Sequence, residues 1–425
     1  MKIFIKTYGC SFNSSDSEIM AGLINESKEH SIVNSIDEAD LIIVNSCTVK
    51  EKAENKLWRD IREINKPIIV AGCVPQAEQD KTKFKEMPVV GTYNVDKIVE
   101  VIDNYSKGDV VQLFNKKELV RVNIPKKRIN PIVEIVPINE GCLGKCDYCK
   151  TKFARGYLKS YPIKDIVKHI RDSLNNGAKE IWLTSQDTAC FGYDINTNIV
   201  NLLKEILRIN REFKIRLGMG NPDFLPDYLD ELIEVFKDPR IYKFLHIPIQ
   251  SGSNNVLKAM KRNYTVESFK KIILEFKKVH PMVTIASDII VGYPNETNSD
   301  FEKTIELLNK IKPDVLNISR FWYRPGTLAM KKKKLPTLTV KNRGIKITKV
   351  FHKLALEVNK KWLKWEGDVL ITEKGIKNTW IGRNYAYRPV ILKGDFKLGN
   401  LINVKITKTT NIDLRGIRRG ARNGA

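Results

Sequence analysis

The residues that decide the fold lie at 141–150, where the chain reads GCLGKCDYCK. They follow an apolar run at 132–138, IVEIVPI, which predicts a buried strand. Cys142, Cys146 and Cys149 therefore stand at C-x-x-x-C-x-x-C spacing in one loop just past a strand end. Three thiolates in so short a loop can all reach one metal centre, and thiolates are the ligands that hold iron–sulfur clusters. A four-iron cluster with three protein ligands keeps one iron open for chemistry.

A structural zinc site and a disulfide framework are the alternatives to a cluster. Zinc would need a fourth ligand, usually from a second C-x-x-C or a pair of histidines. The next cysteine is Cys190, and the nearest histidine is His169, which lies inside a helical pattern. Disulfides are rare in a long, lysine-rich chain without a secretory signal. The loop instead resembles the radical S-adenosylmethionine (SAM) signature, and Tyr148, directly before the last cysteine, fits that pattern. The resemblance implies reductive cleavage of SAM to a 5′-deoxyadenosyl radical.

Length and charge limit the class of protein. A chain of 425 residues is enough for roughly two to four domains. The net charge of +24 attracts polyanions, and nucleic acid is the usual partner, although a generally lysine-rich proteome would give the same surface. No apolar run approaches membrane-spanning length, and residues 1–6 predict a strand and not a signal peptide. The seven cysteines have no even spacing, which suits a reducing compartment, so we expect a cytoplasmic protein without a membrane partner.

The first 115 residues predict a parallel α/β sheet domain with cysteines at its strand ends. Apolar runs at 2–9, 39–46 and 66–72 each end directly before a cysteine, namely Cys10, Cys47 and Cys73. Helical patterns separate the runs, which indicates parallel strands with right-handed crossovers. Because the carboxyl ends of such strands share one edge, we expect the three thiols to converge and hold a second cluster. For each cysteine alone, a small buried hydrophobic residue is the alternative.

The central part, about 129–360, alternates strand and helix patterns about six times. This predicts a partial (β/α)6 barrel, too short for a closed barrel of eight units. Polar residues near the strand ends are candidate SAM contacts: Gln186, Gln250 and Asp288, the last of these inside an otherwise apolar strand. A loop or cap role is the alternative for each. The lysine run at 331–334 is either a solvated surface or a contact for a phosphate backbone.

The last part, 361–425, changes to short strands separated by Gly, Asn and Asp. This spacing predicts a small all-β barrel of the OB kind. Aromatic and cationic side chains alternate in one stretch, which suits base stacking and phosphate contacts, so four residues are candidate RNA-binding residues: Arg383, Tyr385, Tyr387 and Arg388. A barrel that only caps the central domain is the alternative.

Taken together, these features resemble the radical SAM methylthiotransferase family along essentially the whole chain. The segments KTYGCSFN at 6–13, PIQSGS at 248–253 and DIIVGYP at 288–294 match family motifs. The resemblance implies a 4Fe-4S cluster on each group of three cysteines, a SAM-binding central domain and a C-terminal TRAM domain that binds the substrate. It also implies that Tyr148 and the polar strand-end residues contact SAM.

Two further segments look most like the archaeal and eukaryotic branch of that family: 10–18 and 184–192. This branch converts N6-threonylcarbamoyladenosine, at position 37 beside the anticodon of tRNA, into its 2-methylthio derivative. The implied reaction uses two SAM molecules, one to methylate a sulfur and one to remove hydrogen from C2 of the adenine. The partners are then the tRNA anticodon loop, an electron donor and a sulfur source. The alternatives are isopentenyladenosine in tRNA, an aspartate of a ribosomal protein, or an iron–sulfur RNA-binding protein without turnover.

Overall fold

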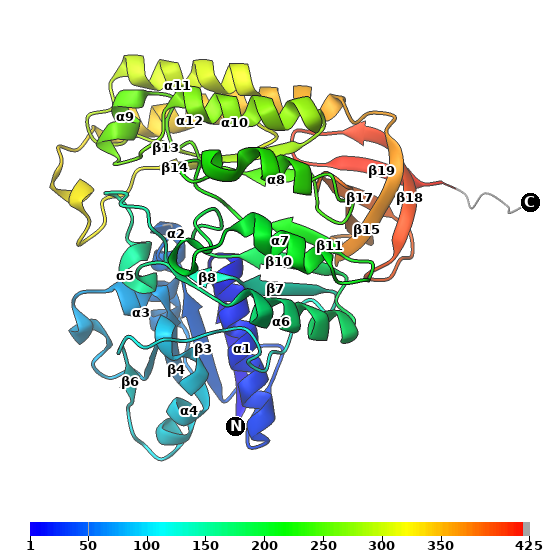
Figure 1. Ribbon diagram of the computed structural model, residues 1–425. Coiled ribbons are helices and arrows are strands. Elements are labelled where there is room, and N and C mark those ends of the chain that lie inside the picture. The colour runs from blue at the N-terminus through cyan, green and yellow to red at the C-terminus, as the bar shows by residue number, and fades with distance from the viewer. Residues whose placement is uncertain (50, 420–425) are drawn as a thin grey trace, which may run out of the picture.

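The computed structural model describes residues 1–49 and 51–419, so residues 420–425 of the predicted third part lie outside the description. Three structural parts follow one another along the chain (Figure 1). The N-terminal sheet and its helices, in blue and cyan, lie below the central strands in green. The C-terminal strands, in orange and red, form a closed barrel at one side of the central part.

The N-terminal sheet has parallel strands in the order β2-β1-β3-β4-β5-β6. The strands are β1 (Lys2–Thr7), β2 (Ser31–Ile32), β3 (Leu41–Ser46), β4 (Ile68–Gly72), β5 (Val89–Gly91) and β6 (Gln112–Leu113). Ile43 of β3 pairs with Ile5 on one side and with Ile69 on the other. β3 is buried along its whole length, as expected for a strand covered on both faces. The predicted parallel sheet is confirmed.

Helices cover both faces of this sheet. They are α1 (Ser11–Ser27), α2 (Glu51–Glu63), α3 (Cys73–Ala77) and α4 (Ile98–Ser106), with 3-10 turns at Lys81–Phe84 and Thr92–Lys97. Side chains alternate along a strand, so neighbouring residues of β3 face opposite layers. Ile43 packs with Ile19 of α1, whereas Val44 packs on the other face with Leu57 of α2.

Helix α1 carries polar residues at buried positions because it lies between the sheet and the central part. Asn13, Asp16 and Glu18 are all buried. The helix packs against β7 (Val133–Pro137), where Ser15 Oγ donates a hydrogen bond to the carbonyl of Ile135 at 3.3 Å. An amphipathic helix on a free surface would expose these polar groups to water. Here they make contacts within the protein.

The central part contains two groups of three parallel strands, in the orders β11-β10-β7 and β12-β13-β14. They are β7, β10 (Glu180–Thr184), β11 (Lys214–Leu217), β12 (Phe244–His246), β13 (Thr284–Val291) and β14 (Val315–Arg320). A parallel bridge from Ile215 to Ile241 lies between the groups. A short antiparallel pair, β8 (Asn139–Glu140) with β9 (Lys159–Ser160), flanks the cysteine loop. The six parallel strands confirm the predicted radical SAM fold.

Helices form the outer layer of the central part (Figure 1). They are α5 (Thr151–Arg155), α6 (Ile163–Asn175), α7 (Ile199–Leu207), α8 (Leu229–Val235), α9 (Asn254–Ala259), α10 (Val266–Val279), α11 (Asn298–Ile311) and α12 (Thr337–Lys360), with 3-10 turns at Tyr193–Ile195, Leu225–Tyr228 and Leu328–Lys331. Thr265 and Thr297 cap the first turns of α10 and α11 by accepting hydrogen bonds from backbone N–H groups. α12 then leads into the barrel.

The C-terminal strands close into a barrel in the order β15-β16-β17-β19-β18. They are β15 (Glu366–Lys374), β16 (Thr379–Arg383), β17 (Pro389–Lys393), β18 (Leu401–Thr409) and β19 (Leu414–Arg418). β18 alternates over residues 401–406: Ile402, Val404 and Ile406 are buried in the barrel, while Leu401 and Lys405 are exposed. Trp362, 2% exposed, belongs to the same core. The predicted small β-barrel is confirmed.

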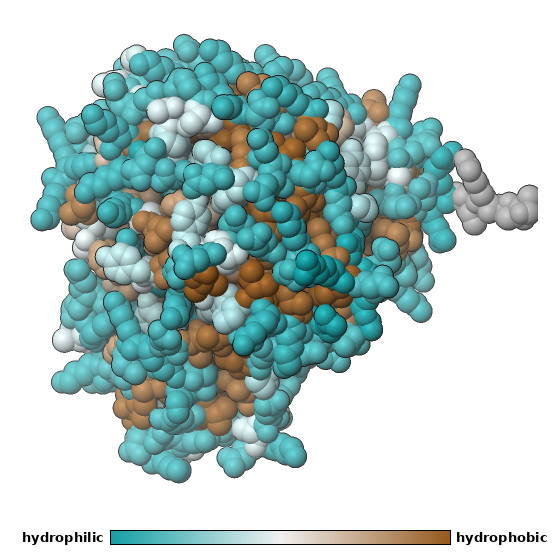
Figure 2. All heavy atoms as spheres, in the orientation of Figure 1, coloured by the Kyte–Doolittle hydropathy of each residue, from teal (hydrophilic) through white to brown (hydrophobic). Residues whose placement is uncertain are grey.

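The surface agrees with the basic, polar composition. Figure 2 shows hydrophilic residues over most of the face drawn there. Within residues 1–49 and 51–419, no helix combines the length and the apolar character needed to cross a membrane.

Candidate metal centres

Cys10, Cys47 and Cys73 lie together at one edge of the N-terminal sheet. The last residues of β3 and β4 pair in the parallel ladder, so the cysteines that follow them are neighbours. Gly9, with φ +117°, brings the chain from β1 against them: a Cβ on Gly9 would lie 2.5 Å from Cys47 Cβ. Only glycine tolerates both this conformation and this close approach. The topology thus unites cysteines that are far apart in the sequence.

Burial and crowding shape the electrostatics of this first group. Burial, with smaller effects from Cys10 and Cys73, raises the pKa of Cys47 to about 12. Burial also raises the pKa of Cys73, and the nearby Arg155 opposes that shift. Crowded thiolates repel one another and stay ionised only with a bound cation. Three soft sulfur donors fit an iron–sulfur cluster and do not fit hard cations such as Mg²⁺.

The second group lies in the loop at 141–150, which is held at its start and in its middle. Gln186 Oε1 accepts a hydrogen bond from the Gly141 backbone N–H at 2.7 Å. Asp147 is buried, and its Oδ2 accepts from Tyr293 Oη at 2.7 Å and from Lys332 Nζ at 2.6 Å. A buried carboxylate with two such donors resists displacement, because losing either hydrogen bond would leave its negative charge poorly compensated in the interior. The loop is therefore a fixed platform for its cysteines.

The loop wraps its cysteines around Gly144. A Cβ on Gly144 would lie 3.6 Å from Cys146 Sγ and 3.7 Å from Cys142 Sγ. Burial, followed by the effect of Cys149, raises the pKa of Cys142 to about 12. Arg262 Nη1 donates to Cys146 Sγ at 3.1 Å, which favours the thiolate form of that ligand. These donors again fit an iron–sulfur cluster.

The candidate SAM contacts lie in two places. Gln186 is hydrogen-bonded to Gly141 of the cysteine loop, and Tyr148, within that loop, packs against the cluster of Met260 and Tyr293. Sequence reasoning proposed both residues as SAM contacts, and the structure adds a role for Gln186 in holding the loop.

Gln250, which follows β12, lies beside Asp288 of β13. The backbone N–H of Gln250, which has φ +72°, donates to the carbonyl of Asp288 at 2.8 Å. The Asp288 side chain accepts from Asn317 Nδ2 at 2.7 Å and lies 3.0 Å from His246 Nε2. A carboxylate within an apolar strand needs polar partners, and these contacts provide them.

Two of the four residues predicted to bind RNA require a correction. Tyr387 and Arg388 are buried, at 9% and 2% exposed, so they are not free to meet RNA. Arg388 Nη1 lies 3.5 Å from Asp314 Oδ1 of the central part, and its Nη2 donates to Asn359. Arg383 pairs with Glu373 at 2.9 Å.

The turn between β16 and β17 docks the barrel onto the central part, which is why this stretch is buried. The Tyr387 ring lies 4.8 Å from the ring of Tyr242 and 5.2 Å from that of Phe244. Lys243 donates its backbone N–H to the carbonyl of Tyr385 at 2.8 Å. The Tyr385 side chain stays 37% exposed. The aromatic and cationic residues of this stretch thus form mainly a domain interface. This agrees with the alternative in which the barrel caps the central domain.

A buried network of charged residues between the N-terminal and central parts was not predicted. Arg121 Nε donates to Asp16 Oδ1 at 2.6 Å, and Arg121 Nη1 donates to Glu140 Oε2 at 2.7 Å. Arg155 contacts the same two carboxylates at 2.7 and 3.1 Å, and the Phe12 ring faces both guanidinium groups. Asp16 and Arg121 are 105 positions apart, so no local pattern could reveal the contact.

The lysine run at 331–334 also has a role that the sequence did not indicate. Lys332 reaches the buried Asp147 of the cysteine loop, whereas the other three lysines of the run are exposed. Arg262, beside Cys146, was likewise missed, because an isolated arginine in a loop carries no sequence signal.

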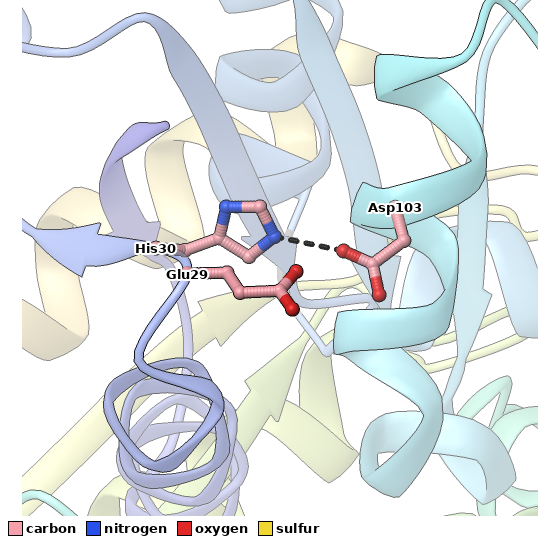
Figure 3. A group of neighbouring side chains, drawn as sticks. All are labelled: Glu29, His30 and Asp103. Carbon is pink, nitrogen blue, oxygen red and sulfur yellow. Dashed lines mark hydrogen bonds and ion pairs between the residues drawn. The ribbon is translucent and has the colours of Figure 1, made fainter.

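A further group of metal-binding residue types lies at the end of α1. Figure 3 shows the side chains of Glu29, His30 and Asp103 close together. One potential ligand atom from each lies within 4.8 Å of the others. Both nitrogens of His30 are already engaged: Nε2 lies 2.8 Å from Asp103 Oδ1, and Nδ1 lies 3.2 Å from the Met1 amino group. We interpret the group as a structural contact that holds α4 against the turn after α1.

The parallel strands, the helical outer layer and the three-cysteine loop define a radical SAM enzyme. Residues 136–308 match the Radical SAM superfamily, residues 2–92 match the Uncharacterized protein family UPF0004, and residues 366–417 match the TRAM domain. Among solved structures, the radical SAM methyltransferase TsrM from Kitasatospora setae has a TM-score of 0.54 at 12% identity and covers 77% of this chain and 73% of its own. At that identity the likeness concerns the fold alone.

Relatives with much higher identity extend over the whole chain. A Pyrococcus abyssi protein named "Probable threonylcarbamoyladenosine tRNA methylthiotransferase" is 40% identical over 417 residues, which are 96% of this chain and 98% of that protein. The Homo sapiens threonylcarbamoyladenosine tRNA methylthiotransferase is 39% identical over 98% of this chain and 73% of its own length. The chain belongs to this family of radical SAM methylthiotransferases.

Proposed function

We propose that this protein converts N6-threonylcarbamoyladenosine at position 37, beside the anticodon of tRNA, into its 2-methylthio derivative. One observation carries the proposal: two separate three-cysteine groups in a chain that is 40% identical, over 96% of its length, to a protein named for that activity. The contact of Arg324, which follows β14, with the carbonyl of Thr48 supports joint action of the two groups, because it ties the loop of the first group to the central part.

The two groups are the proposed ligand sets of two 4Fe-4S clusters. The first cluster would be held by Cys10, Cys47 and Cys73, and the second, which also binds SAM, by Cys142, Cys146 and Cys149. When bound, the clusters and SAM supply the electron transfer and radical chemistry that an unactivated aromatic C–H bond requires. The chain's own contribution is to hold the ligands: Asp147 anchors the loop, and Arg262 places a positive charge against Cys146 Sγ.

Four residues of the central part are the proposed SAM contacts: Tyr148, Gln186, Gln250 and Asp288. The support for Tyr148 and Gln186 is their position, since Tyr148 is part of the cysteine loop and Gln186 is hydrogen-bonded to it. The support for Gln250 and Asp288 is that a backbone hydrogen bond joins the segment after β12 to β13. Tyr148 packs against an apolar cluster that includes Met260 and Tyr293, and exclusion of water there would protect a radical from quenching.

The tRNA partner is supported by the net charge of +24 and by the TRAM match. Exposed cations on β18 and β19 are the revised candidates for phosphate contacts: Lys405, Lys408, Arg415 and Arg418. Of the original four residues, Tyr385 keeps enough exposure for a base contact. We propose units at 1–115, 129–360 and 361–425, with the anticodon loop as the RNA region bound. An electron donor and a sulfur source complete the set of partners.

The test is nucleoside mass spectrometry of tRNA from a host that makes threonylcarbamoyladenosine but not its methylthio form. Expression of this chain is expected to yield the 2-methylthio nucleoside, and Cys142→Ala is expected to abolish it. Cys190→Ala is the matched control, because the buried Cys190 lies beside the second group but is not one of its three proposed ligands, so its loss should leave the product in place. SAM cleavage without this product would point to isopentenyladenosine or a protein substrate. Absence of both would leave an RNA-binding protein without turnover.

A further inference from the structure

A buried connection joins the loops that carry the two cysteine groups. We call it the inter-centre bridge and define it by Thr48, Glu54, Lys150 and Arg324. Thr48 directly follows Cys47 in the N-terminal part, and Lys150 directly follows Cys149 in the central part. A connection between Thr48 and Lys150 therefore links the positions of Cys47 and Cys149, one proposed ligand of each centre.

The ion pair between Glu54 and Lys150 is the core of the bridge. Lys150 Nζ lies 3.6 Å from Glu54 Oε1, with the two side chains 1% and 10% exposed. Among the described residues, Lys150 Nζ has no hydrogen-bond acceptor in range, and Glu54 forms an ion pair with it. The second oxygen of Glu54 accepts from Thr48 Oγ1 at 3.2 Å. A chain of contacts thus runs from the residue after one ligand to the residue after the other.

Arg324 adds a second, independent connection. It follows β14 of the central part and is 6% exposed. Its two terminal nitrogens donate to the backbone carbonyls of Thr48 and of the next residue. Burial lowers the pKa of Arg324, while Cys149, Glu54 and Cys47 act in the opposite direction, so its charge lies within reach of both cysteine groups.

We propose that Glu54, Lys150 and Arg324 are positioning residues that hold the two cysteine groups at one fixed separation. The inference rests on the proposed function, since a fixed separation matters when both centres act on one nucleoside. Buried charges enforce it, because moving the loops apart would leave an ammonium or a carboxylate in the interior without its partner. Misplacing reacting groups by about 1 Å can reduce a rate on the order of 100-fold.

The experiment uses the full chain with both clusters reconstituted under anaerobic conditions and reduced with dithionite. Electron paramagnetic resonance measures the dipolar splitting between the two reduced clusters, which depends steeply on their separation. A second readout is the amount of methylthio nucleoside formed per 5′-deoxyadenosine released. The variants are Glu54→Gln, Lys150→Met and the conservative Lys150→Arg.

The matched control is Glu134→Gln. This substitution also removes a buried carboxylate that pairs with a buried lysine, since Lys126 Nζ lies 2.6 Å from Glu134 Oε1 with side chains 5% and 4% exposed. Glu134 lies in β7, before the cysteine loop, and takes no part in the bridge. Any effect of general destabilisation at the domain interface should therefore appear in this variant as well.

Glu54→Gln and Lys150→Met are expected to change the splitting and to lower product per 5′-deoxyadenosine by about 10- to 100-fold. Lys150→Arg and Glu134→Gln are expected to keep both values. If Glu54→Gln does not fold, the same measurements are made on the double variant Glu54→Gln/Lys150→Met, which removes both charges of the pair and leaves neither unpaired. Unchanged splitting and yield in these variants, or no splitting in the unmodified protein, would overturn the inference. A protein that shows bridge-dependent splitting but makes no methylthio nucleoside would support the inference and refute the proposed function.

Discussion

Replacing Asp16 with asparagine should destabilise the junction of the N-terminal and central parts. The carboxylate accepts from Arg121 Nε at 2.6 Å and from Arg155 Nη2 at 2.7 Å, and these three side chains are at most 1% exposed. With Glu140 as the second carboxylate, two guanidinium groups face two carboxylates and the network is neutral. Asparagine would leave one positive charge unbalanced and would turn an amide donor toward an arginine donor.

The magnitude follows from burial. Breaking a fully buried ion pair by removing one partner costs about 3–5 kcal/mol, whereas an exposed pair contributes about 0–1 kcal/mol. For a cooperative unit of about 150–250 residues, 1 kcal/mol shifts the melting temperature by about 2–4 °C. Asp16→Asn is therefore expected to lower the transition that includes this junction by about 6–20 °C.

Differential scanning calorimetry provides the measurement. The matched control is Glu231→Gln, which removes the exposed Lys204–Glu231 pair, 3.2 Å apart with side chains 52% and 56% exposed. The double variant Asp16→Asn/Arg121→Met restores a neutral network and should recover part of the loss. A shift for Asp16→Asn no larger than that for Glu231→Gln would refute the reasoning, because burial would then not decide the cost.

Two further predictions concern single residues. Burial raises the pKa of Glu134, but Lys126 and His169 outweigh it and bring this pKa from 4.5 down to about 2. The native state therefore favours the carboxylate, so about 3 kcal/mol of stability is present above pH 4.5 and is lost as the pH falls toward 2. Acid titration should show this loss in the unmodified protein and not in Glu134→Gln; identical acid profiles would contradict it. Arg262→Gln should lower the reduction potential of the second cluster by about 65–130 mV in a redox titration, because it removes a charge-assisted bond to Cys146 Sγ of about 1.5–3 kcal/mol. An unchanged potential would show that this bond does not tune the cluster.

Local sequence patterns predicted the elements that present the cysteines. The apolar runs before Cys10, Cys47 and Cys73 became strand ends on one sheet edge, since parallel strands with helical crossovers leave no other arrangement. The same kind of reasoning was wrong for Tyr387 and Arg388. Alternating aromatic and cationic residues favour RNA contacts and also favour a polar domain interface, and only burial distinguishes the two.

The sequence by itself therefore determined the strand and helix order, the two cysteine groups and the family. These depend on spacing along the chain, because hydrophobic periodicity and ligand spacing act over a few residues. The tertiary structure alone decided which charges lose contact with water and which partners they find. Asp16 and Arg121, or Asp147 and Lys332, meet only because packing brings distant segments together. Their pairing is then enforced by the cost of leaving a charge unpaired in the interior.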